Sequence, residues 1–441
     1  MFKYVVLEAV SAVVGIVALA TILISLWKKK NSLLIKRKHL YLPVGLLTLS
    51  VFVGLIANRT YPPSFAMPSF MHSHSPDGLP PSIPFAKIIE FFRHKNRFEK
   101  VEDIGRDPND VPSMPLIPDS DGVVRISLVT KEVIGEVAPD IFFNYWTFNG
   151  QTPGPMIRVR EGDSVELTLT NDSSSLHDHN IDLHAVTGPG GGATLTHVSP
   201  GETKTFRFKA INPGLFIYHC AMPNVSTHNS HGQYGLILVE PKDGFSEVDK
   251  EFYVVQGELY TLGALGKRGL VPFDSEALLD GKPNYVTFNG KIESLPRMNA
   301  NVGDKIRIYV GNGGVNLISS FHVIGEIFDT VYPDANIGGS VERNVQTTAV
   351  LPGGASIVEF TVDVPGQYLL VDHALARMNK GAWAVLNVAG EESPDIFTEI
   401  NSEEIAYEQG LRNGDLLIKI DGKEITPGNL FEFFLNICIN K

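Results

Sequence analysis

Two histidines and a cysteine in the middle of the chain are spaced as metal ligands often are. Cys220 lies on the C-terminal side of His179 and eight residues before His228. A copper electron-transfer site needs two imidazoles and one thiolate in a plane, with a weak axial group. These three residues can supply that plane. A buried, inert thiol is the common alternative for a cysteine, and His231 could replace His228.

Two further histidines indicate a second metal. Successive side chains of a strand face opposite sides, so His219 must point away from a metal bound by Cys220. His184 also differs in parity from His179, so each of these two histidines can serve a different metal. We therefore expect His184 and His219 to bind a second metal, whose electrons arrive through the covalent Cys220–His219 link.

The second metal site lacks a third imidazole in this region. A catalytic metal with three imidazoles and one open position binds a small substrate. His322 and His373 are the candidates for the missing ligand, and spacing does not choose between them. Asp182 and the histidine that is not a ligand can act as acid–base groups. The alternative for Asp182 is an aspartate satisfied by backbone N–H groups.

An internal repeat predicts the elements that position these residues. The segment Tyr145-Trp-Thr-Phe-Asn-Gly matches Tyr285-Val-Thr-Phe-Asn-Gly, and each is followed by an alternating strand, 164–170 or 305–310. Alternation with frequent turns is typical of Greek-key β-sandwiches. We expect an all-β fold with two tandem sandwiches, at 119–243 and 244–390. The segment from Pro213 ends in His219-Cys220, whereas its partner from Pro365 ends in Asp372-His373 with no cysteine, so only the first repeat can hold a cysteine-based site.

Composition excludes several classes of function. The 441 residues suggest two or three domains, and the net charge of −12 argues against binding to nucleic acid. The two cysteines are Cys220 and Cys438, and no CxxCH or CxxC motif is present. This excludes covalent c-type haem and a zinc ribbon. We expect Cys438, in an apolar run, to be a packed thiol.

The N-terminal region has a different character. Apolar runs from Tyr4 to Trp27 and from Leu40 to Ala57 flank a loop of lysines and an arginine. We expect residues 1–58 to form two transmembrane helices, with the loop in the cytoplasm and the remainder anchored to the plasma or inner membrane on the periplasmic or extracellular side. A cleaved signal peptide or a buried hairpin are the alternatives. Residues 59–118 read as a linker, with His72 and His74 in solvent.

Longer motifs around these histidines make the chain resemble the copper-containing nitrite reductases from about residue 119 to 390. The motifs are His179-Asn-Ile-Asp-Leu-His-Ala-Val-Thr-Gly-Pro-Gly-Gly-Gly, Pro213-Gly-Leu-Phe-Ile-Tyr-His-Cys-Ala, Gly235-Leu-Ile-Leu-Val-Glu-Pro, Ser319-Ser-Phe-His-Val-Ile-Gly-Glu-Ile-Phe-Asp, Asn344-Val-Gln-Thr-Thr and Val371-Asp-His-Ala. The resemblance implies two tandem cupredoxin domains, two coppers per subunit and reduction of nitrite to nitric oxide. It also implies a homotrimer served by a small cupredoxin or cytochrome c donor.

The resemblance also implies a role for each site residue. Asp182 and His322 match the family's catalytic pair, and Ile324 matches the apolar residue beside the open copper position. The ligands it implies are His179, Cys220 and His228 for the type 1 electron-transfer copper, and His184, His219 and His373 of the partner subunit for the type 2 catalytic copper.

One ligand position departs from the family pattern. The family's axial type 1 ligand is methionine, and Gln233 stands at that position here, while Met222 does not match it and is expected to pack. Glutamine is a known axial alternative. Its harder carbonyl oxygen should favour Cu(II) and lower the reduction potential.

The C-terminal segment and two other functions complete the predictions. Residues 391–441 resemble the second half of a PDZ domain, a family that adds a peptide as an extra strand. A multicopper oxidase is one alternative, but such an enzyme would have histidines on both sides of the cysteine, and Ala221 follows Cys220 here. A copper protein that only carries electrons or binds copper is the other alternative.

Overall fold

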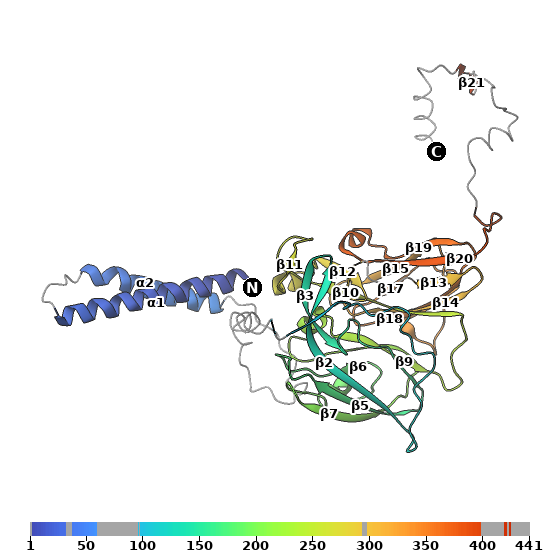
Figure 1. Ribbon diagram of the computed structural model, residues 1–441, viewed down its shortest axis with the longest axis horizontal. Coiled ribbons are helices and arrows are strands. Elements are labelled where there is room, and N and C mark those ends of the chain that lie inside the picture. The colour runs from blue at the N-terminus through green and yellow to red at the C-terminus, as the bar shows by residue number, and fades with distance from the viewer. Residues whose placement is uncertain are drawn as a thin grey trace. The chain divides into compact units, whose positions relative to one another are not determined.

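The structure is a computed structural model that describes residues 2–31, 38–59, 96, 98–292, 298–397, 419–420 and 423–424. The chain divides into two units, Met1–Glu391 and Glu392–Lys441. The first unit contains two β-sandwiches (Figure 1). The all-β, cupredoxin-like prediction is confirmed for these sandwiches.

The first sandwich has one sheet of six strands and one of four. In the larger sheet β1 pairs with β2, and the path order is β11-β3-β2-β5-β7. The smaller sheet has the order β4-β9-β8-β6. The strands are β1 (Glu99–Val101), β2 (Val123–Ala138), β3 (Ile141–Phe148), β4 (Ile157–Arg160), β5 (Ser164–Asn171), β6 (Asp182–Leu183), β7 (Thr203–Lys209), β8 (Gly214–His219), β9 (Tyr234–Glu240) and β11 (Gly269–Leu270).

The second sandwich has two sheets of five strands, β12-β10-β14-β18-β16 and β13-β20-β19-β15-β17. Its strands are β10 (Lys250–Leu259), β12 (Tyr285–Phe288), β13 (Met298–Asn301), β14 (Lys305–Asn312), β15 (Ser319–Ile324), β16 (Thr330–Tyr332), β17 (Thr347–Val350), β18 (Ala355–Thr361), β19 (Gly366–Asp372) and β20 (Trp383–Ala389). Short helices are α4 (Val225–Ser230), α5 (Ser275–Leu279), η2 (Pro189–Gly192), η3 (Pro333–Ala335) and η4 (Leu375–Lys380).

Alternation of apolar and polar residues produces each core. In β5, Val165, Leu167 and Leu169 are fully buried, while the residues between them are partly exposed. This period of two directs one face of the strand inward. A separate apolar cluster fills the second sandwich, with Phe321 and Val323 of β15 among its members.

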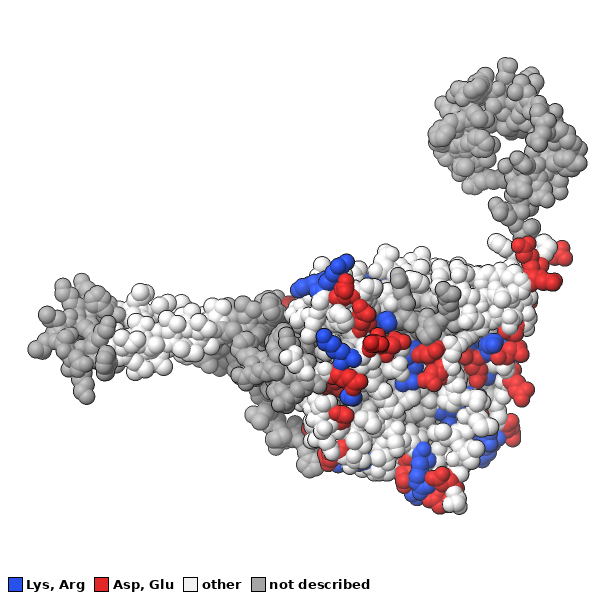
Figure 2. All heavy atoms as spheres, in the orientation of Figure 1, with Lys and Arg blue, Asp and Glu red and all other residues white. Residues whose placement is uncertain are grey.

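The two sandwiches pack against each other through a third apolar cluster. Leu236 and Leu238 of β9 meet Tyr253 and Val255 of β10 there. A buried ion pair crosses the same boundary, since Arg158 contacts Glu240 of its own sandwich at 2.6 Å and Glu251 of the second at 2.8 Å. Elsewhere the surface charges of both signs are interspersed, as Figure 2 shows for one face.

The segment before the first sandwich differs from the predicted linker. Although residues 59–118 were expected to be a spacer, β1 pairs with β2 in parallel, and Ile104 is fully buried. The predicted linker therefore contributes to the fold from Glu99 onwards. His72 and His74 lie outside the described residues.

The N-terminal residues form two helices, α1 (Phe2–Asn31) and α2 (Lys38–Arg59), which run side by side (Figure 1). Among the residues that the structure describes, no helix is long and apolar enough to cross a membrane. The predicted transmembrane helices are thus not supported. The location inferred from them stays an untested prediction.

In the C-terminal unit the structure describes residues 392–397 and two short strands. β21 (Lys419–Ile420) pairs antiparallel with β22 (Lys423–Glu424). The rest of the predicted PDZ-like segment, with Cys438, lies outside the described residues.

Candidate copper centres

Three side chains meet in the interior of the first sandwich. The ring nitrogen Nδ1 lies 3.9 Å from Cys220 Sγ in His179 and 3.3 Å from it in His228. His179 and Cys220 are completely buried, and His228 nearly so. The structure therefore brings together the trio that spacing predicted for the first metal.

Local structure positions each of these ligands. His179 is held by a backbone bridge to Val198, Cys220 follows the last residue of β8, and His228 lies in α4. Asn180 fastens the loop after Cys220 because its Oδ1 accepts the Ala221 N–H at 2.7 Å. The cysteine thus leaves the sheet where the loop to α4 begins.

The protonation states of His179, Cys220 and His228 fit metal ligands better than side chains that only pack in a core. Burial raises the pKa of Cys220 to about 12, so a thiolate needs a nearby cation. Burial also lowers the pKa values of His179 and His228, which keeps both imidazoles neutral and able to donate a lone pair. Two neutral imidazoles and a thiol beside them are the donor set of a copper electron-transfer site.

Gln233 closes another side of this cluster. Its Oε1 lies 3.4 Å from His228 Nδ1, and it is fully buried. Among the described residues, Gln233 Nε2 has no hydrogen-bond partner. A buried amide nitrogen without a hydrogen-bond partner is energetically unfavourable. Because the amide oxygen faces His228 of the ligand set, Gln233 fits the axial role predicted for it. Met222 instead packs against the first core, as expected.

Aromatic rings surround the cluster. Trp146 stacks on His231 with a centroid distance of 4.2 Å and meets His228 edge-on at 4.5 Å. His231 Nδ1 donates to the Thr227 carbonyl at 2.7 Å. This uses one ring nitrogen of His231, and the cluster forms with His228 instead.

A second group lies on the opposite side of β8. His184 Nε2 and His219 Nε2 are 3.1 Å apart, and an Asp182 carboxylate oxygen lies with them inside a 4.8 Å group of possible metal ligands. The register pairs Asp182 directly with His219. Burial and the neighbouring His219 lower the pKa of His184. Two imidazole nitrogens that face each other without a third imidazole are an incomplete metal site.

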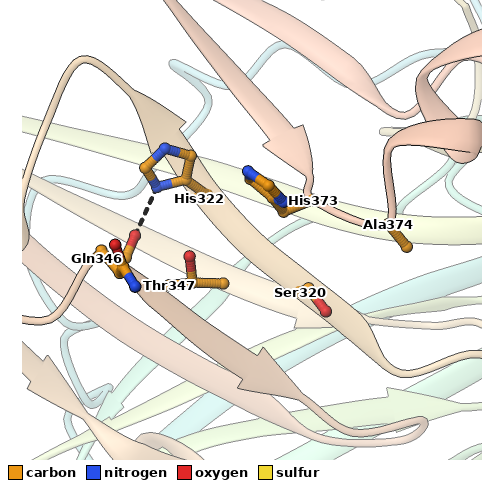
Figure 3. Close-up of a pocket in the computed structure, with 6 residues that line it drawn as sticks. All are labelled: Ser320, His322, Gln346, Thr347, His373 and Ala374. Carbon is orange, nitrogen blue, oxygen red and sulfur yellow. Dashed lines mark hydrogen bonds between the residues drawn. The ribbon is translucent and has the colours of Figure 1, made fainter. Parts of the chain in front are cut away.

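The remaining predicted histidines lie together in the second sandwich. His322 of β15 and His373, directly after β19, have ring centroids 5.4 Å apart. They line a pocket of about 400 Å³ with Ser320, Gln346, Thr347 and Ala374 (Figure 3). His322 Nδ1 lies 2.5 Å from the Gln346 carbonyl, which can only accept, so Nδ1 carries the hydrogen. Ile324 is 40% exposed at the end of the same strand.

Within one chain the structure does not complete the second group. Among the described residues, the possible metal ligands gathered around His184 and His219 include Asp182 but neither His322 nor His373. The sequence reasoning also missed Glu132 and Trp146, which contact the first cluster from strands far upstream. No motif marks Glu132, whereas Trp146 was visible as the residue that differs between the repeated segments, where Val286 replaces it.

The tandem sandwiches and the buried His–Cys–His cluster define a two-domain, cupredoxin-like copper protein. The family description "Multicopper oxidase" matches residues 136–244, which lie mainly in the first sandwich. A copper-containing nitrite reductase from Neisseria gonorrhoeae is 52% identical over 65% of this chain and 74% of its own length.

Solved structures agree with this relationship. The copper nitrite reductase of Nitrosomonas europaea superposes with a TM-score of 0.55 at 33% identity, over 62% of this chain and 96% of that one. The copper-containing nitrite reductase of Thermus scotoductus SA-01 gives 0.54 at 32% identity, over 61% and 62%. The chain belongs to the copper-containing nitrite reductase family.

Proposed function

We propose that this protein reduces nitrite to nitric oxide, in a reaction that consumes one electron and two protons and releases one water. The observation that carries the proposal is the direct peptide link between Cys220 and His219, which belong to different donor groups on opposite sides of β8. That link is a short covalent path for the electron.

The two donor groups have different tasks. His179, Cys220, His228 and Gln233 would hold the type 1 copper, and His184, His219 and His373 of the partner subunit would hold the type 2 copper. When bound, copper supplies one-electron redox chemistry at the first group and an open Lewis-acid position for nitrite at the second.

A site divided between subunits accounts for two incomplete halves. The pair His184–His219 lacks a third imidazole. The pocket at His373 contains two imidazoles, His322 and His373, but neither His184 nor His219. Because His322 lies beside His373, a partner that provides one provides both. Head-to-tail contact between unlike surfaces closes into a ring, which supports the homotrimer implied by the family.

Asp182 and the partner's His322 are the proposed acid–base groups. Asp182 is paired across the sheet with His219, so its carboxylate lies at the second donor group. His322 Nδ1 is held by the Gln346 carbonyl, which leaves Nε2 to take up or release a proton. Ile324 would restrict the open position to a small anion. A small cupredoxin or cytochrome c is the proposed donor, on the strength of the family.

Complementation between two inactive variants tests the divided site. His184→Ala and His373→Ala should each abolish nitric oxide formation and keep the type 1 absorption. Co-expression of the two full-length variants should restore activity, because random assortment gives about a quarter of the interfaces an intact site. No recovery in mixed trimers would contradict the division, since a site within one chain cannot be rebuilt this way.

The substituted axial ligand favours one other function, that of an electron carrier. A carrier would show the type 1 absorption and cycle with a reductant, but it would bind no type 2 copper. Copper counting and electron paramagnetic resonance of the full-length wild type separate the two. Two coppers per chain with nitric oxide formation support the enzyme, whereas one copper without turnover supports the carrier.

A further inference from the structure

The two sandwiches contain glutamates at equivalent positions. Thr130 of β2 and Gln256 of β10 each lie between an antiparallel and a parallel neighbour strand, and each pairs with a phenylalanine on one side and an asparagine on the other. Glu132 and Glu258 come two residues later in their strands. Both carboxylates are buried, at 0% and 2% exposure. The pair is therefore a repeated feature of the fold.

One task is common to both glutamates. Glu132 Oε1 accepts the backbone N–H groups of Leu176 and His177 at 2.7 and 2.8 Å. Glu258 accepts those of Asn316 and Leu317, the latter at 2.8 Å. Each carboxylate thus fastens the loop that leads into the next strand, β6 or β15. Buried backbone donors of this kind need an acceptor.

The glutamates differ in their side-chain partners. Glu132 Oε1 lies 3.0 Å from His177 Nδ1 and 3.7 Å from His179 Nε2. Glu258 is contacted instead by the Tyr260 hydroxyl. Among the described residues, His179 Nε2 and Glu132 Oε2 lack a hydrogen-bond partner although both are buried. The 3.7 Å approach therefore places the neutral His179 ring nitrogen beside a carboxylate, and this nitrogen has no other partner in the part of the chain that the structure describes.

We propose that Glu132 is a positioning residue for the type 1 copper, which orients His179 and adds a buried negative charge beside it. The inference rests on the proposed copper site. A carboxylate can only accept, so the nitrogen facing it, Nε2, carries the hydrogen, and Nδ1 keeps its lone pair on the side of Cys220. Partners of this kind fix the tautomer and ring orientation of metal-bound histidines and raise their basicity.

His177 braces this arrangement from the outside. Its ring lies against Trp146 with a centroid distance of 4.3 Å, and its Nδ1 shares the same Glu132 oxygen. One carboxylate oxygen therefore joins the loop backbone, a partly exposed histidine and the buried ligand. In the second sandwich the two oxygens of Glu258 contact the loop backbone and the Tyr260 hydroxyl but, among the described residues, no histidine, which makes Glu258 a matched control.

The test compares Glu132→Gln with Glu258→Gln in the full-length, copper-loaded protein. Glutamine keeps an acceptor for the loop but removes the charge, so both variants should lose thermal stability to a similar degree. Only Glu132→Gln should shift the type 1 absorption, raise the reduction potential and weaken copper retention against a chelator by about 10–100-fold. Glu132→Asp keeps the charge and should fall between Gln and the wild type.

Two outcomes decide the matter. If Glu132→Gln and Glu258→Gln lower the melting temperature equally and both keep the wild-type spectrum, potential and copper retention, Glu132 only fastens a loop. If Glu132→Gln fails to fold, Glu132→Asp decides instead. Its shorter side chain moves the carboxylate away from His179, so an unchanged type 1 spectrum, potential and copper retention would overturn the proposal in the same way. These readouts need no nitrite turnover, so a wild type with the type 1 spectrum but no nitric oxide would refute the proposed activity alone.

Discussion

The two sandwiches carry chemically different residues at one equivalent position, Cys220 in the first and Asp372 in the second. In the first, β8 pairs His219 with Asp182, and Cys220 is the next residue. In the second, β19 pairs Val371 with His322, and Asp372 is the next residue and the last of the strand. Asp372 therefore occupies the place of the cysteine. Both residues are completely buried, but one is a thiol and the other a carboxylate.

The second sandwich satisfies its buried acid internally. Asp372 accepts from Arg377 at 2.5 Å, from Gln256 at 3.1 Å and from the N–H groups of Ser320 and Ala374. Around Cys220, by contrast, side-chain nitrogens of His179 and Gln233 lack partners among the described residues. The second sandwich thus supplies a complete set of partners for its buried acid, whereas in the first the ring nitrogens Nδ1 of His179 and His228 face the Cys220 thiol, as ligands of one metal would.

The two proposed acid–base groups, Asp182 and His322, occupy equivalent strand positions in the two sandwiches. Asp182 lies opposite His219 just as His322 lies opposite Val371. The repeat thus places one acid–base group at the same strand position of each sandwich. In the proposed head-to-tail assembly the two groups of one site come from neighbouring subunits.

The largest expected effect is on turnover. Asp182→Asn and His322→Gln should each lower the rate of nitric oxide formation by about 100-fold or more, the range of general acid–base catalysis. The type 1 absorption should stay at its wild-type value, because neither residue belongs to the His179–Cys220–His228 cluster. A nitric oxide electrode and an absorption spectrum measure the two quantities. Full activity in either variant would remove that residue from the proton path.

Loss of the Asp372 charge in the second sandwich should lower the stability of the fold rather than turnover. Asp372→Asn leaves Arg377 without its counter-ion, and we expect a loss of about 2 kcal/mol in the free energy of unfolding, because the arginine is partly exposed to water. Denaturant unfolding measures this loss. The type 1 spectrum should not change, so a spectral change would show that the two sandwiches are more tightly coupled than the contrast implies.

The sequence predicts where neighbouring residues of one strand point, but not which distant strands bring their residues together. Strand parity correctly separated His219 from Cys220, because period-two geometry is local. Parity could not choose between His322 and His373, which come together only through neighbouring strands β15 and β19. Glu132 went unnoticed for the same reason, since its contacts with His177 and His179 join segments more than forty residues apart.

The axial residue Gln233 should set the reduction potential of the type 1 copper. Gln233→Met replaces a carbonyl oxygen by a softer thioether, which favours Cu(I), so the type 1 potential should rise. A redox titration of the full-length protein followed at the type 1 absorption band measures it. Met222→Leu is the control, because Met222 packs against the core and should leave the potential unchanged. An unchanged potential in Gln233→Met would mean that the amide oxygen does not act on the metal.

The smallest expected effect is a pH dependence confined to the second sandwich. Burial and the nearby Asp363 and Asp329 raise the pKa of Glu326 to about 7. The first sandwich has Val186 at the corresponding place, four residues after Asp182 as Glu326 is four after His322. An acid whose pKa is higher in the folded state binds its proton more tightly there. Its contribution to stability is therefore present below the unfolded pKa, near 4.5, and is lost as the pH rises towards 7.

Glu326→Gln should remove this slope. The gain in the free energy of unfolding at pH 7.5 over wild type should be about 1 kcal/mol, because the carboxyl is partly exposed and solvent screens it. At pH 4.5 the two proteins should be equally stable. Melting temperatures from pH 4.5 to 7.5 test this, with Val186→Gln as the control in the first sandwich, where no change of slope is expected. A wild-type slope retained in Glu326→Gln would place the titrating group elsewhere.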